Sequence, residues 1–265
     1  MPDNNQITDV FFDLDHTLWD FERNSALTFE KIFGELKIDL NLVDFLAAYE
    51  GINHHYWKLY REDKISQKEL RHKRLIKTFQ VIDFAFDPNK IDLISDQYIL
   101  NLSTFSNLFE GAISLLEKLK VKYQLHVITN GFEVVQHNKI NNSGLSSYFK
   151  NVFTSEKVGY KKPHPIIFEY ALDQTNAVAN NSMMIGDSLE ADILGALNIG
   201  MQAIHFNSHD EPIHDHCPIV QNFASGSSFL ERSKIRFSVF FLAFIVGSAT
   251  TVLAGLQKQR TEISN

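Results

Sequence analysis

The 265-residue sequence is poor in several features that mark particular classes of protein. It has a single cysteine, Cys217, which excludes an internal disulfide framework and makes a reducing compartment the default expectation. Positive charge is scarce, because 25 Lys and Arg residues face 32 Asp and Glu residues and leave a formal net charge of -7. We therefore expect no binding to nucleic-acid polymers through overall charge.

The sequence also lacks an internal repeat and a low-complexity linker. We expect no secretory signal, because Met1 to Gln6 is a polar stretch and the apolar run after it is short. What is present is a globular composition, with 44% hydrophobic and 22% charged residues. This length allows one large domain, or a core domain with a smaller partner.

Short apolar runs that end in turn or polar residues predict four buried strands. These runs cover residues 10–12, 125–128, 183–185 and 203–206. Apolar residues at helical spacing predict helices between them, over residues 110–120, 166–172 and 189–199. Strands that alternate with helices predict a parallel sheet in a three-layer, Rossmann-like α/β core.

Residues 21–105 differ from the rest, since they have few β-rich runs and many helix formers. We interpret them as an all-helical insertion after the first strand. Four aromatic residues in this segment are most simply interpreted as packing between helices, with contact to a substrate left open for a minority of them: Tyr49, Tyr56, Trp57 and Tyr60. The basic run over residues 64–77 is expected to be a solvated helix face.

Carboxylates gather where two of the predicted strands end. Asp13 and Asp15 follow the first strand, and Asp187 follows the third, with Asp192 about one helical turn later. The carboxyl ends of strands form the usual ligand crevice of an open α/β sheet, so we expect these acids to converge. One Asp can attack phosphorus and a second can protonate the leaving oxygen. Crowded carboxylates also predict a hard cation such as Mg²⁺.

Candidate phosphate-binding groups lie in two further motifs. Thr129-Asn130-Gly131 follows the second predicted strand and offers a hydroxyl, an amide and flexible backbone N–H groups. Lys162 precedes a proline that opens a helix, where its charge can face a phosphoryl group. Taken alone, Asp-x-Asp is more typical of a turn or an N-cap, and Thr129-Asn130-Gly131 is as typical of an ordinary strand-to-helix turn. A lysine before a proline is a weak signal alone, because surface lysines are common.

In chain order, these residues resemble the four motifs of the haloacid dehalogenase superfamily of phosphohydrolases. The matching positions are Asp13/Asp15, Thr129, Lys162 and Asp187/Asp192, and the resemblance covers residues 7–230. The helical insertion is similar to the type 1 helical cap of that family. The strings at residues 12–21 and 128–132 resemble the branch of pyrimidine 5'-nucleotidases, which act on nucleoside monophosphates.

The resemblance implies a role for each acid. Asp13 would attack phosphorus in line and form an aspartyl-phosphate. Asp15 would be the general acid and base, and its main-chain carbonyl would help to bind Mg²⁺. Asp187 would complete the metal site with Asp13 and Asp15, and Asp192 would support it. In dehalogenating relatives the second acid is absent, so Asp15 favours phosphate esters over carbon–halogen bonds.

The resemblance also implies that Thr129 and Asn130 hold phosphoryl oxygens and that Lys162 positions Asp13 and the phosphate. The expected activity is a Mg²⁺-dependent phosphomonoesterase that hydrolyses pyrimidine nucleoside 5'-monophosphates. A second hypothesis is a sugar-phosphate or phosphoglycolate phosphatase, or a phosphomutase. A third is a membrane-tethered binding protein without turnover.

Histidines outside these motifs suggest other sites. His205, His209, His214, His216 and Cys217 crowd one segment, where a transition-metal site competes with a polar loop as the interpretation. Elsewhere, His126 is expected to be a hydrogen-bonded core histidine. His16 lies between motif residues, and both a substrate contact and a place at the cap hinge are open for it.

Residues 237–256 form an uncharged apolar run with basic residues on both flanks. Its length predicts a candidate transmembrane helix that would anchor the enzyme at the inner face of a membrane, and the two basic flanks leave its orientation undecided. The alternatives are a helix buried against the core and an unusual extension of the reading frame. The resembling family normally lacks such a tail.

The expected organisation has a core domain, a cap and a tail. The core comprises residues 7–20 and 106–230, the cap residues 21–105 and the tail residues 231–265. We expect a cytoplasmic enzyme, with membrane anchoring through the tail as the alternative. Its expected partner is a small-molecule phosphate ester, and the sequence leaves the oligomeric state open.

Overall fold

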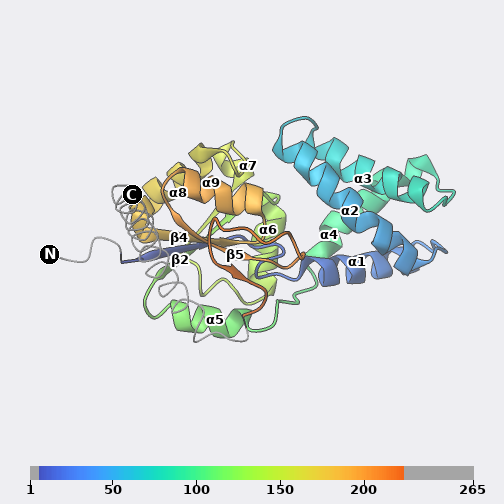
Figure 1. The fold of residues 1–265 in the computed structure, drawn as a ribbon. Coiled ribbons are helices and arrows are strands. Elements are labelled where there is room, and N and C mark those ends of the chain that lie inside the picture. The colour runs from blue at the N-terminus through green and yellow to red at the C-terminus, as the bar shows by residue number, and fades with distance from the viewer. Residues whose placement is uncertain (1–5, 224–265) are drawn as a thin grey trace, which may run out of the picture. The chain divides into compact units, whose positions relative to one another are not determined.

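A parallel sheet lies at the centre of the part of the chain that the computed structural model describes, residues 6–223 (Figure 1). Its six strands lie in the order β3-β2-β1-β4-β5-β6, and every neighbouring pair is parallel. The strands are β1 (Asp9–Phe12), β2 (Gln124–Thr129), β3 (Asn151–Thr154), β4 (Ser182–Gly186), β5 (Gln202–Phe206) and β6 (Ile219–Val220). The predicted parallel α/β core is therefore confirmed.

The four predicted strands correspond to β1, β2, β4 and β5. The sequence prediction missed β3 and β6, which lie at the two edges of the sheet. Both are short, at 4 and 2 residues. The first two residues of β3 and both residues of β6 are only partly buried. Edge strands of this length give little apolar pattern in the sequence.

The register of the sheet brings the ends of three strands to one level. Phe12 of β1 pairs with Val127 of β2 on one side and with Ile185 of β4 on the other. The residues that follow these strands therefore leave the sheet at the same edge. This edge is the carboxyl end of the parallel strands, where ligands bind in open α/β sheets.

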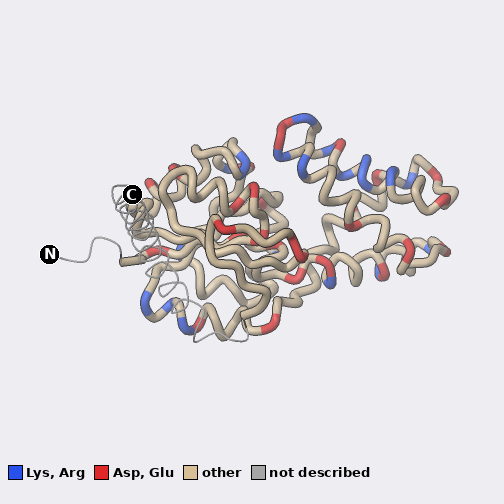
Figure 2. The backbone as a smooth tube through the Cα atoms, viewed as in Figure 1, with Lys and Arg blue, Asp and Glu red and all other residues tan. Residues whose placement is uncertain are grey.

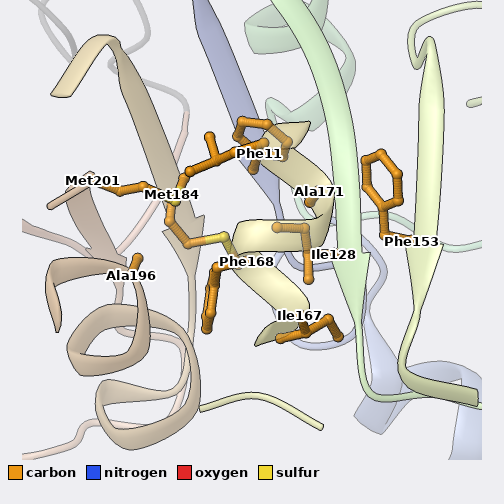
Figure 3. Close-up of a cluster of buried hydrophobic side chains, with 10 residues drawn as sticks. Phe11, Ile128, Phe153, Ile167, Phe168, Ala171, Met184, Ala196 and Met201 are labelled. Carbon is orange, nitrogen blue, oxygen red and sulfur yellow. The ribbon is translucent and has the colours of Figure 1, made fainter. Parts of the chain in front are cut away.

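Helices cover both faces of the sheet, with α8 and α9 on one side and α5 on the other (Figure 1). Helix α8 starts at Pro165, one residue before the predicted helix over residues 166–172 and two residues after Pro163, and it packs Ile167, Phe168 and Ala171 against Phe11 and neighbouring strand residues (Figure 3). The core helices are α5 (Ala112–Leu119), α6 (Glu133–Asn142), α7 (Ser155–Val158), α8 (Pro165–Thr175) and α9 (Gly195–Asn198). A π-helical turn, Leu189–Leu194, precedes α9.

The insertion after β1 is helical, as predicted. It contains α1 (Phe21–Glu35), α2 (Leu42–Arg61), α3 (Gln67–Val81) and α4 (Ile91–Leu102), with a short 3-10 turn, Pro88–Lys90, before α4. Side chains cap the first three helices at their starts, including a capping box at the start of α3. Stacked and edge-on aromatic rings fill the space between the helices: Phe29, Phe45, Tyr49, Phe79 and Tyr98.

Basic residues gather on α3 and on the turn before it (Figure 2). Most of this run is partly or fully exposed, which fits the expected solvated face. Arg74 is the exception, because it is buried, donates a hydrogen bond to Asn53 and lies over the Tyr98 ring. It therefore contributes to the packing of the helical insertion.

The candidate transmembrane segment, residues 237–256, lies outside the described residues. Within residues 6–223, none of the helices combines the length and the apolar character needed to cross a membrane. The sheet and the four inserted helices belong to one compact unit that ends at Asn222.

Candidate active site

The chain leaves β1 through a tight turn that presents Asp13 and Asp15. The backbone N–H groups of Leu18 and Trp19 both donate to the Leu14 carbonyl, at 3.0 and 2.8 Å. His16 adopts a left-handed φ of 61° within this turn, and Trp19 is fully buried beneath it. Buried packing and backbone hydrogen bonds thus fix both carboxylates just beyond the sheet.

Lys162 is the central cation of the site and is almost completely buried. Its Nζ donates to Asp13 Oδ1 at 2.5 Å and to the Ile128 carbonyl at 2.6 Å, and it lies 2.7 Å from Asp192 Oδ1. Burial alone would lower the pKa of Lys162, but the charges of Asp13 and Asp192 outweigh it and raise that pKa. The lysine therefore stays charged and offsets part of the negative charge around it.

Asp13, Asp187 and Asp192 place carboxylate oxygens within 4.8 Å of one another. Burial, with Asp192 adding to it, raises the pKa of Asp13 to about 7 although Lys162 opposes the shift. Burial, with the charges of Asp192 and Asp13 adding to it, raises the pKa of Asp187 well above its ordinary value. One lysine does not balance three carboxylates, of which Asp13 and Asp192 are buried and Asp187 is partly buried. This oxygen-rich, electron-rich set fits a hard divalent cation such as Mg²⁺.

The three acids are held by different elements. Thr17 Oγ1 donates to Asp187 at 3.3 Å, and the backbone N–H of Ser188 donates to Asp192 at 3.1 Å. Asp192 reaches back to the end of β4 because it lies within the π-helical turn. Gly186 leaves the necessary space, since a Cβ at this position would overlap the Asp192 side chain.

Two residues that the sequence analysis missed hold Asp15. Gln136 Nε2 donates to one carboxylate oxygen at 2.7 Å, and Lys139 Nζ donates to the other at 2.6 Å. Both side chains come from α6, three residues apart, and both are buried. Burial lowers the pKa of Lys139, although Asp15 opposes this shift. Its ammonium also lies 4.1 Å from the centre of the Trp19 ring.

Thr129 and Asn130 lie at the end of β2, as expected, but their side chains already have partners. Thr129 Oγ1 accepts from the Gly131 N–H at 3.1 Å. The side-chain amide of Asn130 makes two hydrogen bonds to the backbone of Lys162. Its Nδ2 donates to the Lys162 carbonyl at 2.9 Å, and its Oδ1 accepts from the Lys162 N–H at 2.8 Å. Asn130 thus anchors the loop that carries Lys162, and its amide nitrogen keeps a second hydrogen for another acceptor.

These groups line a cavity of about 490 Å³ that the helical insertion covers. Helix α2 contributes one wall: His54, His55, Trp57, Lys58 and Arg61. Trp57 is therefore the one of the four aromatics named in the sequence analysis that lines the cavity. Its ring lies against Phe132, with the centroids 5.5 Å apart. An aromatic surface and basic groups thus face the carboxylates across the cavity.

Ion pairs join α2 to the loop that carries the acids. Lys58 and Arg61 lie 3.4 and 3.7 Å from Glu190, which is two residues before Asp192. The Lys161 ammonium also contacts the Asp63 carboxylate at the end of α2. At least one partner of each pair is exposed, so each pair contributes little free energy.

The remaining histidine predictions have mixed outcomes. His126 is a hydrogen-bonded core residue, as expected, with Asp9 and Asn151 each 3.1 Å from a ring nitrogen. In the crowded segment, His205 contacts His214 at 2.9 Å and the Asp187 carbonyl at 2.7 Å. His209 lies apart from this pair and contacts His16, so the segment does not converge on one ion.

His16 lines the cavity and lies at the junction with α1 and α2. Burial, with His209 and His54 nearby, keeps the pKa of His16 well below its ordinary value. Burial also lowers the pKa of His54. The imidazoles of His16 and His54 are therefore neutral near pH 7.

Comparison with known families agrees with this geometry. The family model described as haloacid dehalogenase-like hydrolase matches residues 10–206. The match runs from β1 to β5 and so includes Asp13, Asp15, Lys162, Asp187 and Asp192 as well as the helical insertion.

Individual relatives differ in their named substrates. The chain is 31% identical over 201 residues to pyrimidine 5'-nucleotidase YjjG of Escherichia coli K12, which covers 76% of this chain and 86% of that protein. It is 36% identical over 208 residues to a glyceraldehyde 3-phosphate phosphatase of Methanothermobacter thermautotrophicus, covering 75% of this chain and 85% of the relative.

Among solved structures, a similar one is the magnesium-bound HAD-hydrolase YfnB of Bacillus subtilis. It has a TM-score of 0.75 and 27% identity, and the match covers 85% of this chain and 98% of that one. The structure of YfnB is described as revealing interdomain movement.

Proposed function

This chain belongs to the haloacid dehalogenase-like hydrolases and is a phosphoric monoester hydrolase, and we propose that it cleaves pyrimidine nucleoside 5'-monophosphates through an aspartyl-phosphate on Asp13. The observation that carries the proposal is the contact of Lys162 with Asp13 and Asp192 directly below a cavity with an aromatic wall. That arrangement supplies a nucleophile, a charge that orients it and a surface for an apolar ring.

In the first step, an Asp13 carboxylate oxygen forms a bond to phosphorus while the bond from phosphorus to the ester oxygen breaks. The leaving oxygen takes a proton from Asp15, and the nucleoside departs as an alcohol. Gln136 and Lys139 each donate a hydrogen bond to one oxygen of Asp15. To protonate the leaving group, Asp15 therefore gives up one of these hydrogen bonds and forms one to the ester oxygen of the substrate.

In the second step, water attacks the phosphorus of the aspartyl-phosphate. Asp15 accepts the proton of that water, inorganic phosphate leaves, and Asp13 is restored as a carboxylate. Lys162 remains beside Asp13 throughout and compensates the charge on the transferred group. Thr129 and Asn130, at the end of β2, are proposed to hold phosphoryl oxygens through the hydrogens that their internal partners leave available.

Mg²⁺ would be held by the carboxylates of Asp13 and Asp187 with the main-chain carbonyl of Asp15, and Asp192 would support this set. When bound, the ion would neutralise the charge that develops on the phosphoryl oxygens. Burial, with neighbouring carboxylates adding to it, raises the pKa values of Asp13 and Asp187, and a bound cation would oppose both shifts.

Trp57 supports the choice of a nucleoside monophosphate. Its ring faces the cavity from α2, packed against Phe132, and a nucleobase can stack on such a surface. A triose phosphate offers no aromatic ring to this wall. A sugar-phosphate phosphatase is nevertheless the second candidate, because the chain is 36% identical to a glyceraldehyde 3-phosphate phosphatase.

The test is phosphate release from UMP, CMP, glyceraldehyde 3-phosphate and phosphoglycolate, with and without Mg²⁺. We expect the highest kcat/KM for the pyrimidine nucleotides and no Mg²⁺-dependent turnover by Asp13→Asn. The highest kcat/KM for a triose phosphate would replace the first candidate with the second. Phosphate transfer between positions of the substrate, with little net release, would indicate a mutase.

A second arm of the test uses the cap. Trp57→Ala should lower kcat/KM for UMP about ten-fold, since stacking of a base contributes about 1–3 kcal/mol, and should change turnover of glyceraldehyde 3-phosphate much less. The matched control is Tyr56→Ala, which removes the neighbouring aromatic ring that does not line the cavity. Equal losses for both substrates in Trp57→Ala would argue against base stacking.

The division into a core of residues 7–20 and 106–230 and a cap of residues 21–105 stays a prediction. The same holds for a cytoplasmic location and for membrane anchoring through residues 237–256.

A further inference from the structure

We propose that His16, Glu22, His54 and His209 form a second metal site, separate from the carboxylates, that takes a divalent transition-metal ion such as Zn²⁺. The four side chains come from the turn after β1, the start of α1, the middle of α2 and the loop after β5. Their ligand atoms all lie within 4.8 Å of one another.

The geometry is that of donors arranged around a common point. Glu22 Oε1 lies 3.6 Å from His16 Nδ1, 3.9 Å from His54 Nε2 and 3.9 Å from His209 Nε2. All three distances are too long for hydrogen bonds. Ligands about 2.0–2.1 Å from a tetrahedral Zn²⁺ lie about 3.3 Å apart. The three Glu22 distances exceed this value by about 0.3–0.6 Å, and every pair of ligand atoms lies within 4.8 Å, so closing the site around an ion would require inward movements of at most about 1.5 Å.

Glu22 supplies a second, independent indication of a missing partner. Its Oε1 atom is shielded from solvent and accepts no hydrogen bond within the described part of the chain, although the side chain as a whole is 42% exposed. An acceptor oxygen that is buried without a donor costs free energy. A cation bound between this oxygen and the three ring nitrogens would remove that cost.

The donor set separates this site from the Mg²⁺ site. Three imidazole nitrogens and one carboxylate oxygen suit Zn²⁺ and similar transition metals, whereas Mg²⁺ prefers oxygen ligands. The opposite ring nitrogen of His209 lies 3.2 Å from Ser208 Oγ and 3.7 Å from Asp187 Oδ2. Such outer contacts orient a ligating histidine, and here they also link the two sites.

An ion at this position would tie the cap to the core. His54 belongs to α2, whereas His16 and His209 belong to loops at the edge of the sheet. All three histidines line the cavity, so the bound ion would hold α2 over the carboxylates.

The experiment titrates Co²⁺ and Zn²⁺ into the metal-free full-length protein with Mg²⁺ present in excess, so that the carboxylates are occupied. Co²⁺ reports geometry directly, because tetrahedral Co²⁺ absorbs visible light far more strongly than octahedral Co²⁺. We expect one strongly absorbing Co²⁺ per chain, displaced by Zn²⁺. His54→Gln and His209→Gln should each weaken binding by at least about ten-fold.

Two controls separate this site from its surroundings. His55→Gln removes the neighbouring imidazole on α2, which is outside the cluster, and should leave Co²⁺ binding unchanged. Asp13→Asn should also retain it, because Asp13 belongs to the other group of ligands. The unfolding midpoint of each metal-free variant establishes that it is folded.

Weak octahedral absorption, or affinity that His54→Gln and His209→Gln leave unchanged, would overturn the proposal. So would Co²⁺ binding that disappears in Asp13→Asn, since the ion would then belong to the carboxylates. Because every readout is binding, these outcomes do not depend on whether the substrate is a nucleotide.

Discussion

Asp13 combines two properties that oppose each other in a folded protein, since it is buried and it must be ionised to act as a nucleophile. Burial raises its pKa from 3.8 to about 7, with Asp192 adding to the shift and Lys162 opposing it. A cation bound beside it would favour the ionised form again. The residue therefore connects stability, pH and metal binding.

The raised pKa of Asp13 predicts how stability changes with pH when no metal is present. An acid whose pKa is higher in the folded state contributes most stability below its unfolded value, near pH 4, and loses that contribution as the pH rises to about 7. We expect the free energy of unfolding of the wild type, relative to Asp13→Asn, to fall across this window. Urea unfolding in chelator at a series of pH values measures it, and parallel pH curves would contradict the account.

Lys139 is the second prediction at this scale. Its ammonium holds Asp15 at 2.6 Å, so Lys139→Met should lower kcat about 100-fold by disturbing the general acid and base. The methionine keeps the apolar length of the side chain, and the unfolding midpoint reports any loss of folding. The matched control is Lys118→Met, an exposed lysine of α5. A folded Lys139→Met variant with unchanged kcat would remove Lys139 from the site.

Asp13, Asp15 and Asp187 were predictable because each follows a recognisable strand in the sequence. Gln136 and Lys139 were not, since nothing beside them marks them as partners of Asp15. Their spacing of three residues places them on one face of α6, which is a detectable pattern. What that face contacts depends on the packing of α6, which the sequence does not encode locally.

At the scale of an element, β4 and the π-helical turn after it depend on a glycine. A Cβ at position 186 would overlap Asp192, which pairs with Lys162 and accepts from the Ser188 N–H. Gly186→Ala should therefore destabilise the fold by about 1–3 kcal/mol and lower kcat/KM. Thermal unfolding and kinetics measure the two effects.

The control for this substitution is Gly51→Ala in α2. A Cβ there meets nothing within 4 Å, so this change should stabilise the helix by about 0.5–1 kcal/mol. If Gly186→Ala behaved like Gly51→Ala, the close approach of Asp192 to β4 would not matter for activity.

The elements themselves were predicted to different degrees. The buried strands β1, β2, β4 and β5 and the helix at Pro165 were predictable from apolar runs and from a proline in the first turn. The edge strands β3 and β6 were not, because strand pairing places them in the sheet more than their own composition does. The sequence left open which of the aromatics in the insertion would face a substrate, because a helical pattern identifies a face but not what covers it. The structure places Trp57 at the cavity.

At the scale of the whole molecule, the proposed catalytic residues lie between positions 13 and 192, within the unit that ends at Asn222. A version of the protein that ends at Leu230 should therefore keep kcat and KM for its substrate within about two-fold of the full chain. Steady-state kinetics on both proteins measures this. A large loss of activity in a folded, shortened protein would place part of the site in residues 231–265.

The central claim is that the phosphoryl group passes through Asp13. The most direct measurement is a single turnover with substrate labelled in its phosphoryl group, quenched in acid within the first turnover and analysed by peptide mass spectrometry. The account predicts labelled phosphate on the peptide that contains Asp13 in the wild type, and none in Asp13→Asn. Turnover at full rate with no labelled peptide, or with the label on another residue, would contradict it.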